Sequence, residues 1–540
     1  MTFVITQNCC NDATCADVCP ADCIHPTPDE PGYATAEMLY IDPARCIDCG
    51  ACAEACPVDA VYSADELSPQ LRQYSEINAD FYRDRPPTAL PTPSFPSRTT
   101  VADKSLRVAI VGAGPSGFYA AEELLTSVLS VEVSMFDRLP TPFGLVRAGV
   151  APDHTRTKQV TDLFRWTAAS DRFRTFYNVE VGSDVTHADL LRHHHAVIYT
   201  TGALNDRRLG IPGEDLPGSH SAAEFVAWYN GHPDFRDRQF DLGHRRAVVI
   251  GNGNVGLDIA RILLLDVDRL RRTDIADHAL ERLADSNISE VVLLGRRGAA
   301  QAAYTTPELL AFGHLDDIDV VAEDFGGDSS PKARALKRVL AENKGGAKRL
   351  VLKFLGAPNA LVGSGHVQQL RIARSRLVDR NGVVVAEPNG TIEDIETGLV
   401  LRAVGFRGEP IPGVPFDARA GRISNEAGRV VDPATGVPIP GTYTAGWIKR
   451  GPSGVIGTNK RCARETVSLL LEDFGHGRLH DPSASVLELS EMVAGRQPRR
   501  VDRLGWQRID ELERAAGAAA GRPLVKLTDT AQMLTVASGR

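Results

Sequence analysis

Short apolar runs alternate with segments of helical periodicity through most of the chain. Residues 107–111, 131–136, 196–199 and 246–250 are apolar runs that predict buried strands. Residues 118–129 and 257–265 follow two of these runs and predict helices. Strands that alternate with helices predict a parallel sheet with helices on both faces, which is an α/β fold.

The two ends of the chain depart from this pattern. Residues 1–66 are rich in cysteine and lack long helical patterns. Residues 67–100 are predicted to form a linker, because five prolines lie between positions 86 and 96. Residues 471–540 are expected to contain further helices, for example over residues 506–515.

Length and composition are those of a soluble globular protein. The 540 residues predict three to four domains at roughly 150 residues each. Apolar residues make up 43% and charged residues 24%, and no apolar run reaches the ~18 residues that a membrane span needs. The first residues do not resemble a signal peptide. We therefore expect a cytoplasmic protein without membrane insertion.

Charge and cysteine are both concentrated at the N-terminus. The net charge of −9 argues against nucleic acid as a partner. Residues 1–66 hold twelve acidic residues against one basic residue, Arg45, and nine of the ten cysteines lie in the first 56 residues. Clustered cysteines in an intracellular protein indicate a metal site.

The second half of this segment has the spacing of a bacterial iron–sulfur protein, Cys46-x2-Cys49-x2-Cys52-x3-Cys56-Pro57. Three closely spaced thiolates bind one cluster, and the cysteine before proline binds the other. Zinc is the alternative, but zinc sites usually show two separated C-x2-C pairs.

The first half repeats the spacing with one change, Cys9-x2-Asp12-x2-Cys15-x3-Cys19-Pro20. Crossover then predicts one [4Fe–4S] cluster on Cys19, Cys46, Cys49 and Cys52. Cys9, Cys15 and Cys56 would hold a second cluster. That cluster is [3Fe–4S], or a [4Fe–4S] in which Asp12 holds a labile fourth iron. Cys10 could replace Cys9, and Cys23 is interpreted as a buried thiol near a cluster.

A first glycine-rich turn joins the strand at 107–111 to its helix, Gly112-Ala-Gly114-Pro-Ser116-Gly117. Such a turn lets a pyrophosphate approach the helix N-terminus. An acid that binds the ribose is expected about 20 residues later. Asp137, at the end of the next strand, has that position.

A second turn follows the strand at 246–250, Gly251-Asn252-Gly253-Asn254-Val255-Gly256. The next strand, residues 290–295, is followed by Arg296 and Arg297 instead of an acid. Arginine binds the 2′-phosphate of NADP through charge-assisted hydrogen bonds. The second site is therefore predicted to bind NADP.

Two dinucleotide sites and two clusters suggest a flavin between a nicotinamide and the iron–sulfur centres. Flavin accepts a hydride and can return electrons singly, whereas clusters accept electrons only singly. The body of the chain has no C-x-x-C, and Cys462 stands alone. A disulfide reductase would need such a dithiol, so that class is excluded.

Longer motifs carry two family resemblances. Residues 1–66 resemble the seven-iron ferredoxins. Residues 105–470 resemble the adrenodoxin-reductase family of ferredoxin–NADP reductases through residues 139–147, 149–154 and 445–459. Together they are similar to the fused bacterial ferredoxin/ferredoxin–NADP reductases.

The resemblance implies roles for matching positions. FAD would contact Ser116, Asp137, Leu145, Val181, Trp447 and the 454–456 segment, Gly454-Val455-Ile456. The NADP pyrophosphate would lie on Asn252, Gly253, Asn254 and Val255. Glu308 and Gly454 would lie near the nicotinamide, His154 is the candidate proton relay, and Trp447 a nicotinamide gate. The alternatives are that His154 orders its loop and that Glu308 is an exposed acid at a helix start.

The implied architecture is an α+β ferredoxin-like domain (1–66), a discontinuous FAD domain (101–205 and 405–540) and an inserted NADP domain (206–404). The implied function is electron transfer between NADPH and ferredoxin-type clusters. A separate ferredoxin or another one-electron acceptor, such as a P450 system, would be the external partner. The alternatives are a protein like the glutamate-synthase small subunit and a non-catalytic iron–sulfur redox sensor.

Overall fold

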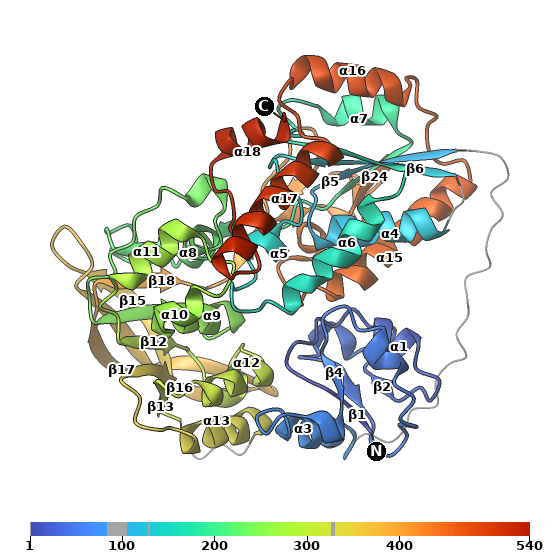
Figure 1. Cartoon of the computed structure of the whole chain (residues 1–540). Helices are drawn as coiled ribbons and strands as arrows, with labels where there is room; N and C mark the ends of the chain where they lie inside the picture. Colours follow the sequence, from blue (N-terminus) through green and yellow to red (C-terminus); the bar gives the residue numbers. More distant parts are fainter. Residues whose placement is uncertain (1, 84–104, 128–129, 326–329, 540) are drawn as a thin grey trace.

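The computed structural model describes residues 2–83, 105–127, 130–325 and 330–539. Figure 1 shows the N-terminal part, in blue, beside two larger parts that each contain a central sheet. Residues 84–100 of the predicted linker lie outside the described residues. No helix in the described part is both long and apolar enough to cross a bilayer.

The N-terminal part consists of two strand pairs and three helices. Its elements are β1 (Phe3–Ile5), α1 (Thr14–Asp17), β2 (Ile24–His25), β3 (Tyr40–Ile41), α2 (Ala51–Glu54), β4 (Val61–Ser63) and α3 (Gln73–Arg83). β1 pairs with β4 and β2 with β3, both antiparallel. A left-handed residue precedes each short helix, Ala13 (φ 61°) before α1 and Gly50 (φ 76°) before α2. The two cysteine turns therefore share one local geometry.

Helix α3 corrects the linker prediction for residues 67–83. The buried side chain of Asn78 accepts hydrogen bonds from the amides of Ile5 (3.2 Å) and Ile41 (2.9 Å) and donates to the carbonyls of Ile5 (2.8 Å) and Tyr74 (2.7 Å). Because Asn78 joins β1 to β3 in this way, α3 belongs to the N-terminal part. We define residues 2–83 as the cysteine module.

The first large part contains a seven-stranded sheet. In spatial order its strands are β22 (Asn425–Glu426), β23 (Arg429–Val431), β24 (Pro438–Thr444), β8 (Ala196–Tyr199), β5 (Leu106–Val111), β6 (Val131–Asp137) and β7 (Phe173–Tyr177). The strands from β24 to β7 are parallel. The apolar run at residues 107–111 therefore lies at the centre of a buried parallel sheet.

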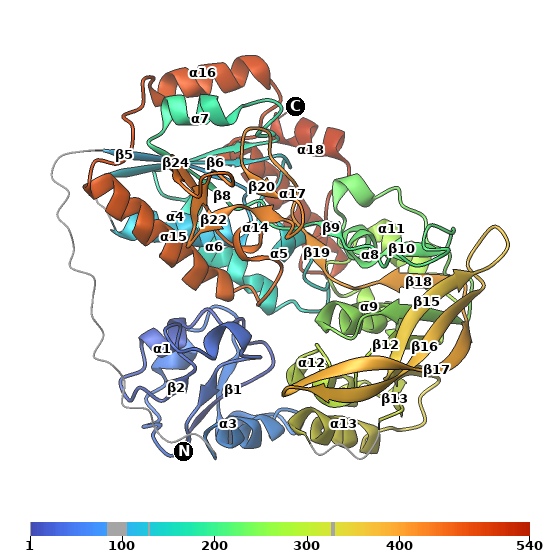
Figure 2. The same ribbon diagram turned by 180° about the vertical axis from the view of Figure 1, so that it is seen from behind.

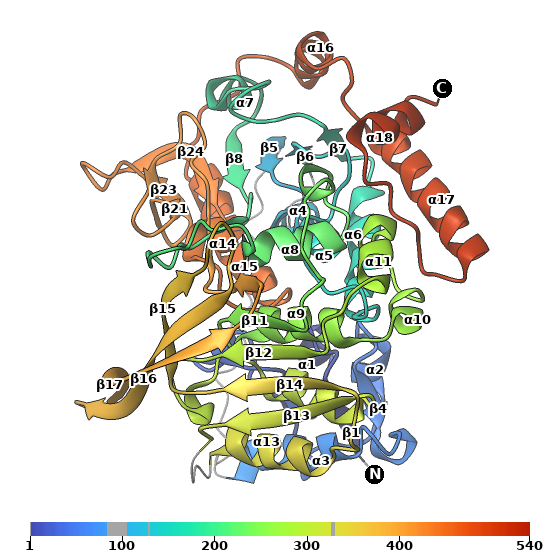
Figure 3. The same ribbon diagram turned by 90° about the vertical axis from the view of Figure 1, so that its left-hand side faces the viewer.

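Helices cover both faces of this sheet (Figure 3). One face packs on α4 (Pro115–Ser127), α6 (Val160–Ala168), α15 (Thr458–Gly475), α17 (Arg503–Ala520) and α18 (Thr530–Ala537). The other face packs on α7 (His187–His193), α14 (Trp447–Arg450) and α16 (Val486–Arg496). The helices expected after residue 471 thus complete the domain of the first strand.

The second large part contains a six-stranded parallel sheet. Its order is β10 (Ser219–Ser221), β18 (Leu399–Arg402), β11 (Arg246–Ile250), β12 (Glu290–Leu294), β14 (Lys348–Lys353) and β13 (Ile318–Glu323). One face packs on helices that include α8 (Ala222–Tyr229), α9 (Asn254–Leu264), α11 (Asp277–Ala284), α12 (Thr306–Leu310) and α13 (Pro331–Ala341).

The opposite face of this second sheet corrects the expectation of helices on both sides. It packs on an antiparallel sheet of β15 (Gly356–Val362), β16 (Gln369–Arg380) and β17 (Val383–Glu396), seen in Figure 2. Leu370 and Ile372 of β16 are fully buried against it. A second sheet therefore supplies the apolar cover that a helix was expected to supply.

Replacing Asn78 with alanine tests the anchoring of α3. Asn78→Ala leaves the buried amides of Ile5 and Ile41 without acceptors, at a cost of about 2 to 3 kcal/mol. Hydrogen exchange at both amides is expected to accelerate roughly 30- to 100-fold. The control Gln70→Ala changes an exposed side chain in the segment before α3. Unchanged exchange in Asn78→Ala would contradict this role.

Candidate functional site

The first glycine turn is shaped to receive a ligand at the start of α4. A Cβ at Gly112 (φ 107°) would lie 2.6 Å from the Thr200 carbonyl oxygen, and one at Gly117 would lie 2.2 Å from the Gly112 carbonyl oxygen. A Cβ at Gly114 would meet open space. The turn is therefore packed tightly on the protein side and open on the side where a phosphate would approach.

Asp137 lies directly beside this turn, at the end of β6. Its carboxylate accepts hydrogen bonds from the amides of Ala113 (2.7 Å) and Leu139 (2.9 Å). Burial raises the pKa of Asp137, although both amides act in the opposite direction. The acid predicted from spacing is thus held next to the glycine turn.

The segment 446–459 follows β24 and meets the same turn at the carboxyl end of the parallel strands. The Ser116 hydroxyl donates to Asn459 Oδ1 (2.9 Å). The Trp447 ring stacks on Phe406 with centroids 6.1 Å apart, and its Nε1 donates to the Ser453 carbonyl (3.1 Å). Trp447 is therefore held rigidly at the start of α14, close to residues that contact the turn.

The other positions expected at this site have varied surroundings. Leu145 begins α5 (Leu145–Ala148), and Val181 forms an isolated bridge with Val185 beyond β7. The Val455 amide donates to Thr458 Oγ1 (3.1 Å), so this amide is already engaged within the chain. Cys462 is buried and accepts a hydrogen bond from the Gly446 amide (3.2 Å).

The second glycine turn has the same construction at the start of α9. A Cβ at Gly251 (φ 116°) would lie 2.2 Å from the Ala403 carbonyl oxygen, and one at Gly256 would lie 2.4 Å from the Gly251 carbonyl oxygen. A Cβ at Gly253 would meet only Ala303, at 3.8 Å. Here too the open side is the side expected to receive a phosphate.

The backbone carbonyl of Asn252 and the side chain of Asn254 in the second turn hold a neighbouring loop. The Asn252 carbonyl accepts from the Tyr304 amide (2.8 Å), and Asn254 Oδ1 accepts from the Thr305 amide (2.7 Å). Val255 packs against the core of the second large part. Asn252 and Asn254 therefore position the loop that leads into α12 and Glu308.

Arg296 and Arg297 follow β12 at the edge of this site. Arg296 is exposed and Arg297 is half-buried. Within the described residues neither guanidinium forms an ion pair with a carboxylate. Two unneutralised guanidinium groups beside a glycine turn can bind an anion.

The fold brings His154 and Glu308 together between the two large parts. His154 Nε2 lies 3.6 Å from Glu308 Oε2, 3.8 Å from Asp258 Oδ1 and 2.6 Å from the Arg261 guanidinium. Arg261 also contacts Asp153 (2.5 Å), Asp258 (2.6 Å) and Glu308 (3.5 Å). This group, which we call the Arg261 cluster, joins residues after β6 to helices α9 and α12.

Three carboxylates share one guanidinium in the Arg261 cluster. Burial raises the pKa of Asp258 to about 6, and Glu308 and Asp153 add to the effect of burial while Arg261 opposes it. Burial also acts to raise the pKa of Asp153, but contact with Arg261 holds that pKa well below its usual range. Among the three carboxylates, Asp258 is therefore the one whose ionised form is least favoured by its surroundings.

Sequence reasoning missed Asp153, Asp258 and Arg261. Asp258 and Arg261 are three residues apart on α9, a helix whose other members are largely apolar and buried. A charged pair within such an apolar helix is a signal that could have identified them.

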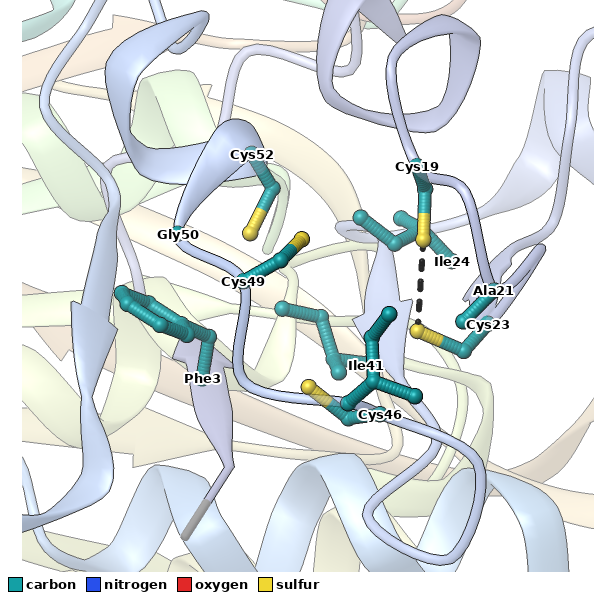
Figure 4. A pocket seen from close by; sticks show the side chains of 11 residues that line it. Phe3, Cys19, Ala21, Cys23, Ile24, Ile41, Cys46, Cys49, Gly50 and Cys52 are labelled. Atoms are coloured by element: carbon teal, nitrogen blue, oxygen red, sulfur yellow. Dashed lines mark hydrogen bonds between the residues drawn. The ribbon is translucent and has the colours of Figure 1, made fainter.

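The second half of the cysteine module places four predicted ligands around one cavity. Figure 4 shows the sulfurs of Cys19, Cys46, Cys49 and Cys52 pointing toward a common space. Cys23 lines the same cavity, and its sulfur lies 3.4 Å from that of Cys19. Convergent thiols of this kind fit a metal cluster.

The other predicted thiols, those of Cys9, Cys15 and Cys56, form a second group, in which Cys15 is buried and the other two are half-buried. Burial raises the pKa of Cys9 to about 12, and the neighbouring Cys56 and Asp12 act in the same direction. The Cys9 sulfur accepts a hydrogen bond from the Leu39 amide (3.5 Å) and the Cys56 sulfur one from the Ala60 amide (3.3 Å). Metal binding stabilises the thiolate form that burial disfavours, so this group also fits a cluster.

Asp12 and Cys10 belong to the same loop but are engaged elsewhere. The Asp12 carboxylate accepts hydrogen bonds from the amide (3.3 Å) and the hydroxyl of Thr14. Cys10 is buried in the core of the first large part. Three thiols therefore remain for the second group, together with a carboxylate that Thr14 already holds.

Comparison with known proteins extends this picture. A sequence profile described as "4Fe-4S binding domain" matches residues 39–62, and one described as "Pyridine nucleotide-disulphide oxidoreductase" matches residues 106–294. The "Probable ferredoxin/ferredoxin--NADP reductase" of Mycobacterium tuberculosis (strain ATCC 25618 / H37Rv) is 50% identical over 100% of this chain and 95% of its own length.

Two further relatives match the two large parts. The "NADPH:adrenodoxin oxidoreductase, mitochondrial" of Arabidopsis thaliana is 38% identical over 82% of this chain and 97% of its own length. The solved structure of Mycobacterium tuberculosis FprA in complex with NADPH is 45% identical and has a TM-score of 0.77. It covers 81% of this chain and 100% of its own.

Neutralising Asp258 tests the charge balance of the Arg261 cluster. The raised pKa means that ionisation of Asp258 destabilises the folded state; this cost is absent below about pH 4 and complete above about pH 6. Relative to the unsubstituted protein, Asp258→Asn is expected to gain about 1 kcal/mol more stability at pH 8 than at pH 5, measured by urea unfolding. Equal changes at both pH values would refute the assignment. Asp162→Asn, at a side chain 65% exposed, serves as the surface control.

Proposed function

This chain belongs to the family of ferredoxin/ferredoxin–NADP reductases, and we propose that it transfers electrons between NADPH and two iron–sulfur clusters in its own cysteine module. The observation that carries the proposal is the presence, in one chain, of two open glycine turns and two groups of convergent thiols. Full-length identity to these reductases favours this function over a glutamate-synthase subunit and over a redox sensor.

We assign FAD to the first glycine turn. Gly112, Gly114 and Gly117 would allow the pyrophosphate to reach the N-terminus of α4, and Asp137 would accept from a ribose hydroxyl. Trp447 and the 454–456 segment would cover the flavin ring. Ser116, Leu145 and Val181 would make further contacts with FAD. When bound, FAD accepts a hydride and returns electrons singly.

We assign NADP to the second turn. Gly251, Gly253 and the amides at the start of α9 would hold the pyrophosphate, with Asn252, Asn254 and Val255 shaping the turn. Arg296 and Arg297 would bind the 2′-phosphate, since both lack a carboxylate partner among the described residues.

We assign the nicotinamide side of the site to His154, Glu308 and Trp447. His154 and Glu308 are held by the Arg261 cluster, which joins the two dinucleotide-binding parts. Hydride transfer to flavin needs no acid or base on the protein, so His154 would orient the nicotinamide. Its Nε2 accepts a hydrogen bond from the Arg261 guanidinium (2.6 Å), which would keep the ring in place. Glu308, held by the same guanidinium, would line the nicotinamide side of the site.

We assign a [4Fe–4S] cluster to Cys19, Cys46, Cys49 and Cys52, and a [3Fe–4S] cluster to Cys9, Cys15 and Cys56. Three thiolates suffice for [3Fe–4S]. The hydrogen bonds from Thr14 to Asp12 favour this form over one with a fourth iron. Iron analysis distinguishes them, because seven irons support the proposal and eight contradict it.

We further propose which part of the chain binds each cofactor. The cysteine module carries both clusters, residues 105–205 and 405–539 hold FAD, and residues 206–404 hold NADP. β9 (Asn205–Asp206) pairs with β19 (Phe406–Arg407) where the chain passes between the two large parts. A separate ferredoxin or another one-electron carrier would be the external partner.

An anaerobic NADPH titration of the purified protein, followed by absorbance and electron paramagnetic resonance, tests the proposal. We expect the flavin absorbance to bleach and signals from the iron–sulfur clusters to change in proportion. If the flavin absorbance bleaches but the signals of the iron–sulfur clusters do not change, electron transfer from the flavin to the clusters within this chain is contradicted. Failure of the flavin to bleach with NADPH or NADH would overturn the whole assignment.

Neutral substitutions of the arginine pair test the NADP assignment. Arg296→Gln and Arg297→Gln should each raise the KM for NADPH roughly 10- to 100-fold, since a charge-assisted hydrogen bond to phosphate is lost. The KM for NADH should stay the same. Arg376→Gln, at a side chain 69% exposed, is the matched control. Equal increases for both nucleotides would show that the arginines do not recognise the 2′-phosphate.

A further inference from the structure

The cysteine module contacts the reductase body with one particular side. The Gly457 amide, at the N-terminal end of α15, donates to the Cys10 carbonyl (2.7 Å). A Cβ at Gly457 would lie 2.1 Å from the Asn11 carbonyl carbon and the Asp12 amide nitrogen. The loop that carries Cys9 therefore lies directly against the residue that follows the 454–456 segment.

Apolar packing follows the same contact. Cys10, Val58 and Ala60 are buried in the core of the first large part, and Cys9, Cys56 and Ile456 pack against that core. The buried hydroxyl of Tyr119 on α4 has no hydrogen-bond partner within the described residues. Its pKa is raised by burial and then by Cys10 and Asp12. The Cys9, Cys15 and Cys56 group thus faces the proposed FAD site.

Ion pairs extend the contact to both large parts. Glu37 pairs with Lys332 (3.2 Å) and accepts from the Thr306 amide (2.7 Å). Asp59 pairs with Arg156 (3.1 Å), and Glu76 with Arg338 (3.1 Å). Figure 1 shows α3 beside α13, where the last of these pairs lies. Acidic groups of the module thus meet basic groups of the body.

The cavity of the other cysteine group has no such contact. Its lining residues include Cys19, Cys46, Cys49 and Cys52, and none of the eleven forms a hydrogen bond or ion pair with the body in the described part of the chain. Cys49 is exposed, and Ile47 is 63% exposed. The Cys19, Cys46, Cys49 and Cys52 group therefore reaches the surface of the molecule.

From this arrangement we infer that the Cys19, Cys46, Cys49 and Cys52 group is where electrons pass between this chain and a separate protein, through a docking surface centred on Ile47. The inference depends on the proposed function. We call this surface, formed by Ile47, Asp48 and Cys49, the exchange face. The Cys9, Cys15 and Cys56 group then lies between the exchange face and the proposed FAD site.

Charge indicates the kind of partner that fits. Asp48 is exposed on the exchange face. Residues 1–66, to which this face belongs, hold twelve acidic residues against one basic residue, Arg45, which is exposed two positions before Ile47. An exposed apolar side chain within an acidic surface is complementary to a partner with an apolar centre and a basic rim. The partner is therefore a one-electron carrier protein with positive charge around its redox centre.

The electrons balance with a one-electron partner. NADPH gives up a hydride, which is two electrons and a proton, and becomes NADP+. Two oxidised partner molecules each take one electron and become reduced. One proton is released to solvent for each NADPH oxidised.

Cytochrome c, a basic one-electron acceptor protein, and ferricyanide, a small acceptor that needs no docking surface, serve as probes. We expect Ile47→Lys to lower kcat/KM for cytochrome c about 5- to 10-fold at low salt, because the apolar contact is lost and a like charge is added. Asp48→Asn keeps a residue that tolerates the left-handed backbone of position 48 (φ 58°). It is expected to lower kcat/KM for cytochrome c about 2-fold, because one negative charge is lost. Ferricyanide reduction should be unchanged in both.

Ile392→Lys provides the control, because Ile392 is also an exposed apolar residue (52%) but lies on β17, far along the chain from the module. Electron paramagnetic resonance after NADPH reduction should show the same reduced fraction of both clusters in every variant. That readout separates a docking defect from a damaged cluster. If Ile47→Lys loses the electron paramagnetic resonance signal of a cluster, the inference is tested with Asp48→Asn alone.

Two results would overturn the inference. One is undiminished cytochrome c reduction by Ile47→Lys and Asp48→Asn with both clusters intact. The other is an equal fall with ferricyanide, which would place the defect before the exchange face. Absence of NADPH-driven ferricyanide reduction in the unsubstituted protein would instead contradict the proposed function, so the two failures are distinguishable.

Discussion

The contact between the Gly457 amide and the Cys10 carbonyl is the constraint on which the arrangement of this molecule depends. It brings the cysteine module to the start of α15, next to the segment expected to cover the flavin. The backbones approach so closely that no side chain fits at position 457. A larger residue would push the module away from the reductase body, and electron transfer requires that redox centres be held close together.

A second constraint operates between the two dinucleotide-binding parts. Arg261 is 4% exposed and comes from helix α9, while Asp153 and His154 come from the segment after β6. A buried guanidinium needs carboxylate partners, because a buried charge without them is costly. The same requirement holds the segment after β6 against α9 and positions His154 and Glu308. The residues that join the two parts are thus the ones around the position proposed for the nicotinamide.

Local patterns explain why much of this could be predicted. The strands at 107–111 and 246–250 and their glycine turns depend on neighbouring residues, since an apolar run, a tight turn and a helix start are all local features. The cysteine spacing likewise predicts which thiols meet, because the crossover is encoded in the spacing itself. Helix α3 was missed because its sequence is largely polar and because the hydrogen bonds of Asn78 form only when β1 and β3 lie beside it.

The sequence by itself determined the two glycine turns, the arginine pair after β12 and the two groups of cysteines, because each depends on residues close together in the chain. Only the tertiary structure decided which cysteine group faces the reductase and which faces solvent. It also decided that Asp153, Asp258 and Arg261 surround His154, and that an antiparallel sheet covers the second parallel sheet. The first two features join residues more than a hundred positions apart, whereas the covering sheet follows β14 directly in the chain. In all three, the energy comes from burial and charge pairing that exist only once the parts are packed together.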